Sequence, residues 1–401
     1  MKLKYVPCLL FIASVAVGCS SNRQTNDDMP FIDVRKTYPE KELDITDFAD
    51  VSYVHLNTAD DDYLYKGQIQ CVTKNTLVVY DQSSAGILFF SRDGQPRSRF
   101  NRYGQGPEEY LSTFRNRILY DEKTDDVFVG DPYGRNKYVQ VYSSTGEYKR
   151  KITLPQNSAL SFLVSFDDQS LFVYAEDYHF SFLTMSRTQN SKTDIPHTTY
   201  YRISKTNGEI SDSLRLISDE IELAVIFSSS PSKSIVARGN YCRLTKGVTG
   251  FYLFNPETDT VFHYAGDKSL TPVLYKIPSV RNQDPKVVLT NIVDAGRYQF
   301  FNVATLDGLI PTTRYFFLDK ETGDIFRPKL VLPDFKGKEF TITDSPRMLD
   351  TGDVNGYIFE LGLYELKEAY RENKLSGKLK ELVATLNEDT DNNVFMLVEY
   401  K

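Results

Sequence analysis

One supersecondary pattern occurs twice in the first half of the chain, about fifty residues apart, a spacing typical of repeat architectures. Residues 127–152 read VFVGDPYGRNKYVQVYSSTGEYKRKI, and residues 77–100 read LVVYDQSSAGILFFSRDGQPRSRF. In both copies an apolar strand ends in an aspartate, Asp81 or Asp131, and a later turn contains a glycine, Gly94 or Gly146. Two copies of one strand–turn–strand unit predict an array of small antiparallel β-sheets.

The strands of these units are apolar on both faces. Residues 78–80 (VVY) and 88–90 (LFF) show no alternation of apolar and polar side chains. An antiparallel sheet with one wet face alternates, whereas a propeller blade is packed between two neighbouring blades. The pattern therefore favours a β-propeller.

Four further units with a similar strand rhythm follow, at residues 163–208, 234–264, 287–323 and 348–400, and residues 48–57 are expected in the first unit. Within them, residues 180–185 and 234–238 are predicted to be blade strands. The chain contains no tryptophan, which excludes blades of the Trp-Asp repeat type. We predict an all-β fold, a six-bladed β-propeller of four-stranded antiparallel blades, formed by a single domain over residues 41–401.

Two short helices are predicted within the last blade. Residues 361–370 and 379–386 carry apolar side chains at helical spacing, and Ser376 and Gly377 separate the two segments. Helices packed on the rim of the ring are the favoured interpretation, and a helix that docks a partner is the alternative.

The N-terminus has the layout of a secretory signal. Lys2 and Lys4 precede an apolar run that is shorter than the roughly 20 residues needed to span a bilayer. The run ends at residues 16–19 (AVGC), which resemble a bacterial lipobox with Cys19 as the lipid-modified residue. We predict a lipoprotein signal peptide at 1–18 and a flexible tether at 19–40; an ordinary signal peptide is the alternative. Ser20 replaces the aspartate of an inner-membrane retention signal, which favours the outer membrane and leaves open which side the body faces.

The segment 104–110 (GQGPEEY) is the most distinctive loop of the chain. Two glycines could bring backbone amides close to a phosphate, but Pro107 removes one amide donor and two glutamates would repel an anion. A tight crossover between blades is therefore favoured. The alternative is a binding loop beside the central funnel, in which Arg102, Tyr103, Glu108 and Tyr110 present polar and aromatic groups to a ligand.

Asp81 and Asp131 end equivalent strands and are further candidates for ligand binding. Repeated carboxylates around a funnel could bind sugar hydroxyls or a cation, although an aspartate at a strand end commonly caps its own turn.

The GQGPEEY loop, the lipobox at Cys19 and the segment 387–394 (NEDTDNNV) together resemble the lipid-anchored six-bladed propellers of Bacteroides-type bacteria, which are similar in shape to NHL and TolB-like propellers. The family's usual Asn-Pro before the last strand is Asn392-Asn393 here. The resemblance implies a fold and a place in the cell envelope, and it implies no activity.

Sequence motifs for metals, cofactors and nucleic acids are missing. The four histidines have no zinc spacing, and no Gly-x-Ser-x-Gly elbow occurs. Calcium would suit the oxygen ligands of acidic loops such as 60–62, but neither these nor residues 388–389 have EF-hand spacing. We predict no cofactor and no metal site. A net charge of −7 without a basic run argues against a nucleic-acid partner.

These observations favour a non-catalytic envelope protein that acts as a monomer and binds a glycan, a peptide or a partner protein, because no motif of an enzyme is found. The alternative is a hydrolase or lyase that acts on a polysaccharide in the central funnel, because paired carboxylates meet in space and leave no sequence motif.

Overall fold

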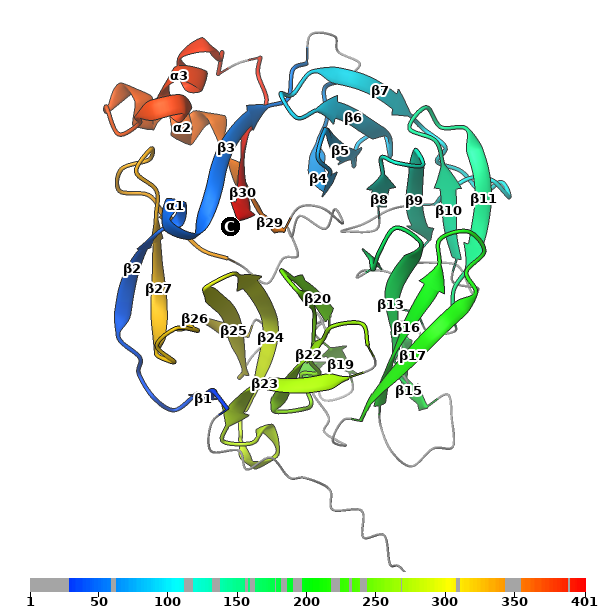
Figure 1. Ribbon diagram of the computed structural model, residues 1–401, viewed down its shortest axis with the longest axis vertical. Helices are drawn as coiled ribbons and strands as arrows, with labels where there is room; N and C mark the ends of the chain where they lie inside the picture. The colour runs from blue at the N-terminus through cyan, green and yellow to red at the C-terminus, as the bar shows by residue number, and fades with distance from the viewer. Residues whose placement is uncertain are drawn as a thin grey trace, which may run out of the picture.

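Six small antiparallel β-sheets lie in a ring around a central axis, so that the chain forms a six-bladed β-propeller as predicted (Figure 1). The computed structural model describes residues 29–58, 63–111, 118–131, 138–155, 158, 163–176, 178–181, 186–189, 197–217, 224–230, 233–238, 244–267, 269–307, 311–342, 355–388 and 390–401. The signal peptide and Cys19 lie outside these residues.

The first three blades each contain four antiparallel strands. Blade 1 consists of β4 (Gly67–Val72), β5 (Thr76–Asp81), β6 (Ile87–Ser91) and β7 (Pro96–Phe100). Blade 2 consists of β8 (Ile118–Asp121), β9 (Asp126–Asp131), β10 (Tyr138–Tyr142) and β11 (Tyr148–Thr153). Blade 3 consists of β12 (Val164–Ser165), β13 (Ser170–Glu176), β16 (His197–Ser204) and β17 (Ile210–Ile217).

The next blades are extended by strands from the N-terminus. Blade 4 consists of β20 (Leu244–Gly247), β21 (Gly250–Leu253), β22 (Thr260–Tyr264) and β23 (Leu270–Ile277), followed by the short η4 (Val280–Asn282). Blade 5 consists of β24 (Lys286–Ala295), β25 (Tyr298–Leu306), β26 (Thr312–Asp319) and β27 (Ile325–Val331), with β28 (Glu339–Phe340) on β27. The described strands of blade 6 are β29 (Gly356–Leu361), β30 (Val394–Tyr400) and β3 (Ala49–His55).

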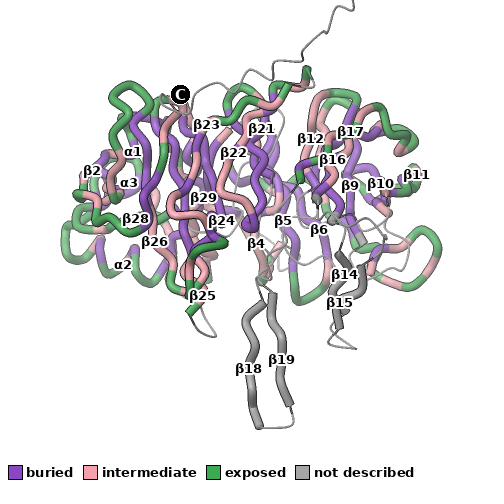
Figure 2. The backbone as a smooth tube through the Cα atoms, turned by 90° about the horizontal axis from the view of Figure 1, so that it is seen from below, coloured by how far each residue is buried: buried purple, intermediate pink, exposed green. Residues whose placement is uncertain are grey.

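Strands in the interior of the blades, such as β5, are buried along their whole length, as their sequences predict (Figure 2). In β5, Leu77 and Val79 pack with residues of blade 6, whereas Val78 packs with residues of blade 2. Successive side chains of a strand point to opposite faces, so one strand contributes to two cores. The hydrophobic cores therefore lie between the blades.

A glycine in the last turn of a blade packs on the outermost strand of the preceding blade. Gly94, Gly146 and Gly208 have φ values of +85°, +86° and +77°. A Cβ atom on Gly146 would lie 2.5 Å from the Cβ of Phe100 in β7, and one on Gly208 would lie 2.7 Å from the carbonyl oxygen of Thr153 in β11. Close approach and a positive φ both require glycine here.

The same contact shows that β3 closes the ring. A Cβ atom on Gly94 of blade 1 would lie 2.0 Å from the carbonyl oxygen of His55, the last residue of β3. β3 pairs along its length with the C-terminal strand β30. The prediction that residues 48–57 belong to the first unit is therefore wrong. The N-terminal strand is instead the outermost described strand of the last blade.

The predicted tether is ordered in its second half. β1 (Phe31–Asp33) pairs in parallel with β23, and β2 (Glu40–Asp44) pairs in parallel with β27. The short α1 (Ile45–Phe48) then leads into β3. The folded domain therefore begins before residue 41, because these short strands find free backbone groups at the outer edges of blades 4 and 5.

Two predicted blade strands belong to side hairpins. The hairpin of β14 (Tyr178–Ser181) and β15 (Ser186–Gln189) takes up part of residues 180–185, and the hairpin of β18 (Ala224–Ser230) and β19 (Lys233–Arg238) takes up residues 234–238. The outer strand of blade 3 is instead β17, ISDSLRLI, which is mostly exposed and carries no apolar run.

The two predicted helices are present between β29 and β30. α2 (Leu363–Arg371) and α3 (Gly377–Thr385) place Leu366, Leu379 and Val383 fully buried in the core that blades 5 and 6 share. This packing agrees with the rim interpretation. Within the described part of the chain, no helix is long and apolar enough to cross a membrane.

Candidate functional site

Asp81 caps its own turn. Its carboxylate accepts hydrogen bonds from the backbone nitrogen of Lys66 at 2.9 Å and from the hydroxyls of Ser83 and Ser84 at 2.7 and 2.5 Å. Burial alone would raise the pKa of Asp81, but these hydrogen bonds hold it below its usual value. The group is 4% exposed, and its hydrogen-bonding capacity is largely used within blade 1.

The GQGPEEY loop is held as a crossover between blades 1 and 2. Tyr110 is fully buried and donates a hydrogen bond at 2.6 Å to the carbonyl of Ala85. Arg102 donates to the carbonyl of Gly146 at 2.9 Å, and the carbonyl of Glu108 accepts from the hydroxyl of Tyr142 at 2.8 Å. These contacts serve the junction of two blades.

The structure shows no binding contact for the other two sequence candidates, Tyr103 and Asp131, among the described residues. The ring of Tyr103 is 58% exposed, and Asp131 is the last residue of β9, with a side chain outside the described residues. The structure thus brings Asp81, Arg102, Glu108 and Tyr110 to one inter-blade region, and ligand binding there stays a prediction.

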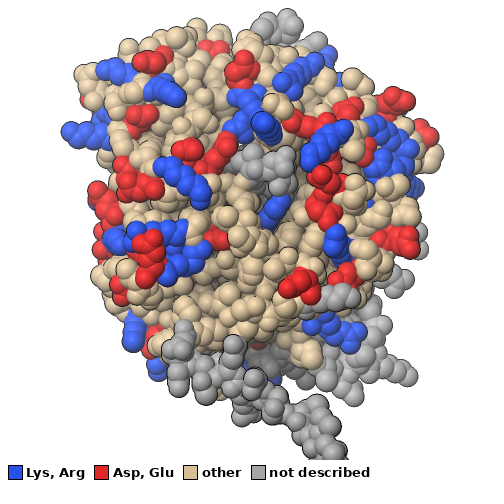
Figure 3. Space-filling model, viewed as in Figure 1, with Lys and Arg blue, Asp and Glu red and all other residues tan. Residues whose placement is uncertain are grey.

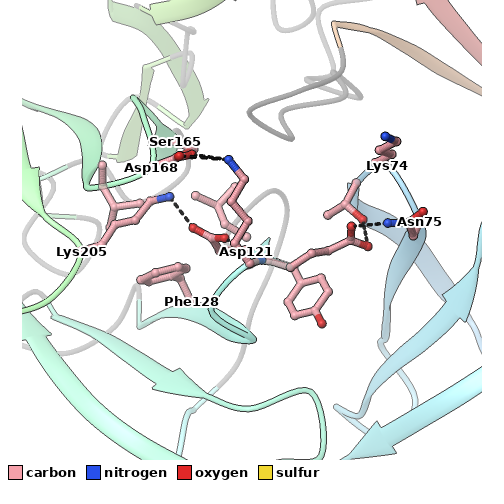
Figure 4. Close-up of a pocket in the computed structure, with 13 residues that line it drawn as sticks. Lys74, Asn75, Asp121, Phe128, Ser165, Asp168 and Lys205 are labelled. Carbon is pink, nitrogen blue, oxygen red and sulfur yellow. Dashed lines mark hydrogen bonds and ion pairs between the residues drawn. The ribbon is translucent and has the colours of Figure 1, made fainter.

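A different set of residues surrounds a pocket of about 310 Å³ between blades 1, 2 and 3 (Figure 4). It forms where the first hairpin turns of the three blades meet the last turn of blade 3. The lining side chains include cations, carboxylates and hydroxyls, together with the apolar side chains of Leu119, Phe128 and Leu171. The charged members are Lys74, Asp121, Glu122, Lys123, Asp168 and Lys205.

Glu122 joins blade 2 to blade 1. Its carboxylate accepts hydrogen bonds from the hydroxyls of Thr73 and Thr76 and, at 3.0 Å, from the side-chain amide of Asn75. Burial raises the pKa of Glu122, but these three donors outweigh it and keep the pKa below the usual value. The Glu122 carboxylate is therefore ionised at neutral pH, and its three hydrogen bonds fix it in the wall of the pocket.

Lys205 joins blade 3 to blade 2. Its Nζ lies 2.7 Å from Oδ2 of Asp121, and the two side chains are only 10% and 12% exposed. The carbonyl of Lys205 also accepts a hydrogen bond at 2.8 Å from Arg150, which is paired with Asp126. Removing one partner of such a buried pair would leave the other charge uncompensated, so the pair fixes this side of the pocket.

The mouth of the pocket carries a second, exposed ion pair. Nζ of Lys123 lies 2.9 Å from both carboxylate oxygens of Asp168, and the side chains are 61% and 69% exposed. The hydrogen bond from Lys123 lowers the pKa of Asp168. Lys74 lies across the mouth from this pair, is exposed, and has no hydrogen bond or ion pair within the described part of the chain (Figure 4).

The pocket can therefore offer both donors and acceptors of hydrogen bonds to a polar ligand. Figure 3 shows charged side chains of both signs around the centre of one face of the molecule. Among the described residues, no three His, Cys, Asp or Glu side chains are grouped to hold a metal ion. Sequence reasoning missed this site because it examined the opposite ends of the strands, although the polar turns 73–75, 122–125 and 166–169 occupy equivalent positions in their units.

One solved structure has a similar fold along most of the chain. The chain is similar to an exported protein from Bacteroides fragilis NCTC 9343, with a TM-score of 0.55 and 16% identity over 91% of this chain and all of that one. It is also similar to virginiamycin B lyase from Staphylococcus aureus, with a TM-score of 0.30 and 11% identity over 68% of this chain and 96% of that one. No curated protein matches the chain. A family model described as "Domain of unknown function (DUF4934)" matches residues 29–399.

Proposed function

The chain belongs to the DUF4934 family, and for this member we propose a lipid-anchored protein of the cell envelope that binds a glycan without catalysing a reaction. The pocket between blades 1, 2 and 3 is the binding site. The observation that carries the proposal is its two-layered construction, with a fixed polar wall behind a mouth of exposed charges.

A glycan suits this construction better than an apolar ligand does. Sugar hydroxyls both donate and accept hydrogen bonds, and the mouth offers donors on Lys74 and Lys123 and acceptors on Asp168. The wall formed by Glu122 and by the Asp121–Lys205 pair is held by contacts across three blades. These side chains therefore lose little conformational entropy when a ligand binds.

The carboxylates argue against a glycoside hydrolase at this position. A general acid for glycoside cleavage needs a raised pKa. The pKa values of Glu122 and Asp168 are both lowered, the first by hydroxyl and amide donors that outweigh burial and the second by Lys123. Both groups are therefore charged at neutral pH and suited to accepting hydrogen bonds.

The location in the envelope is supported by the lipobox-like residues 16–19 and by the similarity to an exported protein. We propose lipid attachment at Cys19 and anchoring in the outer membrane. The ordered strand β1 begins at Phe31, so the polar segment after Cys19 would connect the lipid to the outer edge of blade 4.

A glycan array followed by calorimetry tests the proposed function. We expect at least one oligosaccharide to bind and the Lys123→Ala/Asp168→Ala double variant to bind it about tenfold more weakly, since several contacts of the mouth are lost. The matched control is Lys338→Ala/Glu365→Ala, which removes a comparable surface ion pair of 2.6 Å near α2 and should leave binding unchanged. Turnover of a bound glycan, or binding to envelope proteins and to no glycan, would contradict the proposal.

A further inference from the structure

We propose that Arg150 is a positioning residue of this binding site, although it is not among the described residues that line the pocket. It holds the backbone of Lys205 and thereby fixes the distance between two turns at the mouth. Arg150 lies in β11, the outermost strand of blade 2, whereas Lys205 follows β16 of blade 3. The inference rests on the proposed function and adds to it a residue outside the pocket on which binding depends.

Lys205 is held at three points. Its Nζ lies 2.7 Å from Oδ2 of Asp121, and its backbone nitrogen donates a hydrogen bond at 2.9 Å to the carbonyl of Gln169. Its own carbonyl accepts hydrogen bonds from Nη2 and Nε of Arg150, at 2.8 and 3.2 Å. The three contacts reach three separate segments of blades 2 and 3, so Lys205 can move only if at least one of them breaks.

The contacts of Lys205 continue to the mouth of the pocket. Oδ1 of Asp121 accepts a hydrogen bond at 3.1 Å from the backbone nitrogen of Lys123, and Nζ of Lys123 lies 2.9 Å from Asp168 (Figure 4). Asp168 directly precedes Gln169, which bonds to Lys205. These residues form a closed cycle of contacts between the turns 121–125 and 166–169. The spacing of the two turns therefore depends on the position of Lys205.

Arg150 is itself fixed. Its Nη2 and Nη1 lie 2.5 and 3.3 Å from the two carboxylate oxygens of Asp126, which is 6% exposed. Its Cζ lies 5.9 Å from the ring centroid of Phe128, which lines the pocket. A planar guanidinium can bond to the Asp126 carboxylate and to the Lys205 carbonyl at once, because its five N–H donors have a fixed geometry. Arg150 therefore joins a rigid ion pair in blade 2 to the backbone beside the pocket.

Lys149, the preceding residue in β11, provides a matched comparison. Its Nζ lies 3.0 Å from the same Asp126 carboxylate and also bonds to the carbonyls of Thr124 and Asp125. Successive side chains of a strand point to opposite faces, and Lys149 makes no hydrogen bond to Lys205 within the described part of the chain. Removing Lys149 therefore takes away one charge and one contact to Asp126 without releasing Lys205.

The test measures binding by calorimetry with the tightest-binding member of a panel of neutral and acidic oligosaccharides. Arg150→Met keeps the length of the side chain without its donors, and we expect binding to weaken about tenfold. Lys149→Met should bind like the wild type. Arg150→Lys keeps the charge but not the planar donor group, and we expect a loss of about threefold. Titrations are made at a temperature at which circular dichroism shows every variant folded.

A second measurement follows the pocket wall in the free protein. Amide hydrogen exchange at Lys205 reports whether its bond to Gln169 stays closed. We expect this amide to exchange about tenfold faster in Arg150→Met than in the wild type, and at an unchanged rate in Lys149→Met.

The outcomes separate this inference from the proposed function. A lower melting temperature with unchanged affinity in Arg150→Met would show a merely structural role and overturn the inference, while glycan binding stays intact. Equal losses of affinity in the two Met variants would overturn it too, because charge alone would explain them. If Arg150→Met does not fold, an unchanged affinity of Arg150→Lys overturns it. Failure of the wild type to bind any oligosaccharide would overturn the proposed function as well.

Discussion

Replacing Phe48 by alanine tests whether the N-terminal segment is part of the cooperative fold. Phe48 lies in α1 between β2 and β3, and its ring is 5% exposed. Its centroid lies 5.7 Å from that of Tyr298, 5.5 Å from that of Phe300 and 6.3 Å from that of Tyr400. The ring therefore joins the N-terminus to blade 5 and to the C-terminal strand.

The expected loss follows from this burial. A phenylalanine truncated to alanine in a core costs about 3–5 kcal/mol. The entropy of unfolding of a domain of this size is about 0.8 kcal/mol per degree, so the melting temperature should fall by roughly 5 °C. Thermal and urea unfolding followed by circular dichroism would measure both quantities.

Phe31→Ala provides the matched control for this experiment. Phe31 comes from the same N-terminal segment and stacks on Tyr275 at 5.3 Å, but it is 40% exposed and lies outside the core clusters. Its truncation should cost about 1 kcal/mol or less. Equal and small shifts for the two variants would refute the conclusion that residues 45–55 close the ring.

Three further predictions concern the turn glycines, Asp33 and the proposed lipid anchor. Gly146→Ala should destabilise the protein by roughly 1–3 kcal/mol more than Gly323→Ala in urea unfolding, because both glycines have positive φ but only Gly146 packs against the neighbouring blade; equal losses would contradict the inter-blade contact. The side-chain hydrogen bond from Arg35 lowers the pKa of Asp33 to about 2. A lowered pKa stabilises the folded state above the unfolded value near 3.9, and this contribution disappears as the pH falls to about 2. The difference in stability between the wild type and Asp33→Asn should therefore shrink between about pH 4 and 2, and a constant difference would show that the carboxylate charge contributes nothing. Cys19→Ala should move the protein from the membrane to the soluble fraction of the producing cells, and unchanged membrane attachment would exclude a lipid on Cys19.

Local patterns predicted the parts of the fold that depend on neighbouring residues. The apolar run at 78–80 predicted strands buried on both faces, and the structure divides these side chains between two cores. Gly94 and Gly146 predicted equivalent turns, and both have positive φ against the preceding outer strand. The helical spacing at 379–386 predicted α3, because its apolar face meets one core.

Pairing between distant segments was not predictable in the same way. β3 has apolar residues on both faces, and nothing in its sequence identifies β30, more than 300 residues later, as its partner. β1 and β2 are short and partly polar, so they lack the pattern of a strand and are defined by the free edges of β23 and β27.

Some residues of the candidate site could be predicted from local sequence patterns, and others depend on contacts between distant segments. Lys74, Lys123 and Asp168 occupy equivalent first turns, and a search for polar residues at repeated turn positions would have found them. Lys205 comes from a different turn and reaches Asp121 only because blades 2 and 3 are adjacent. Asp81 and Asp131 looked equivalent in sequence, but Asp81 uses its carboxylate to hold its own turn.

A crystal structure of the protein with a bound oligosaccharide is the most direct test of the binding site. We predict that the ligand lies between blades 1, 2 and 3, with a ring hydroxyl hydrogen-bonded to Asp168, while the Lys205–Asp121 pair stays intact. A ligand bound instead beside Asp81 and Glu108, with the pocket between the three blades empty, would contradict it.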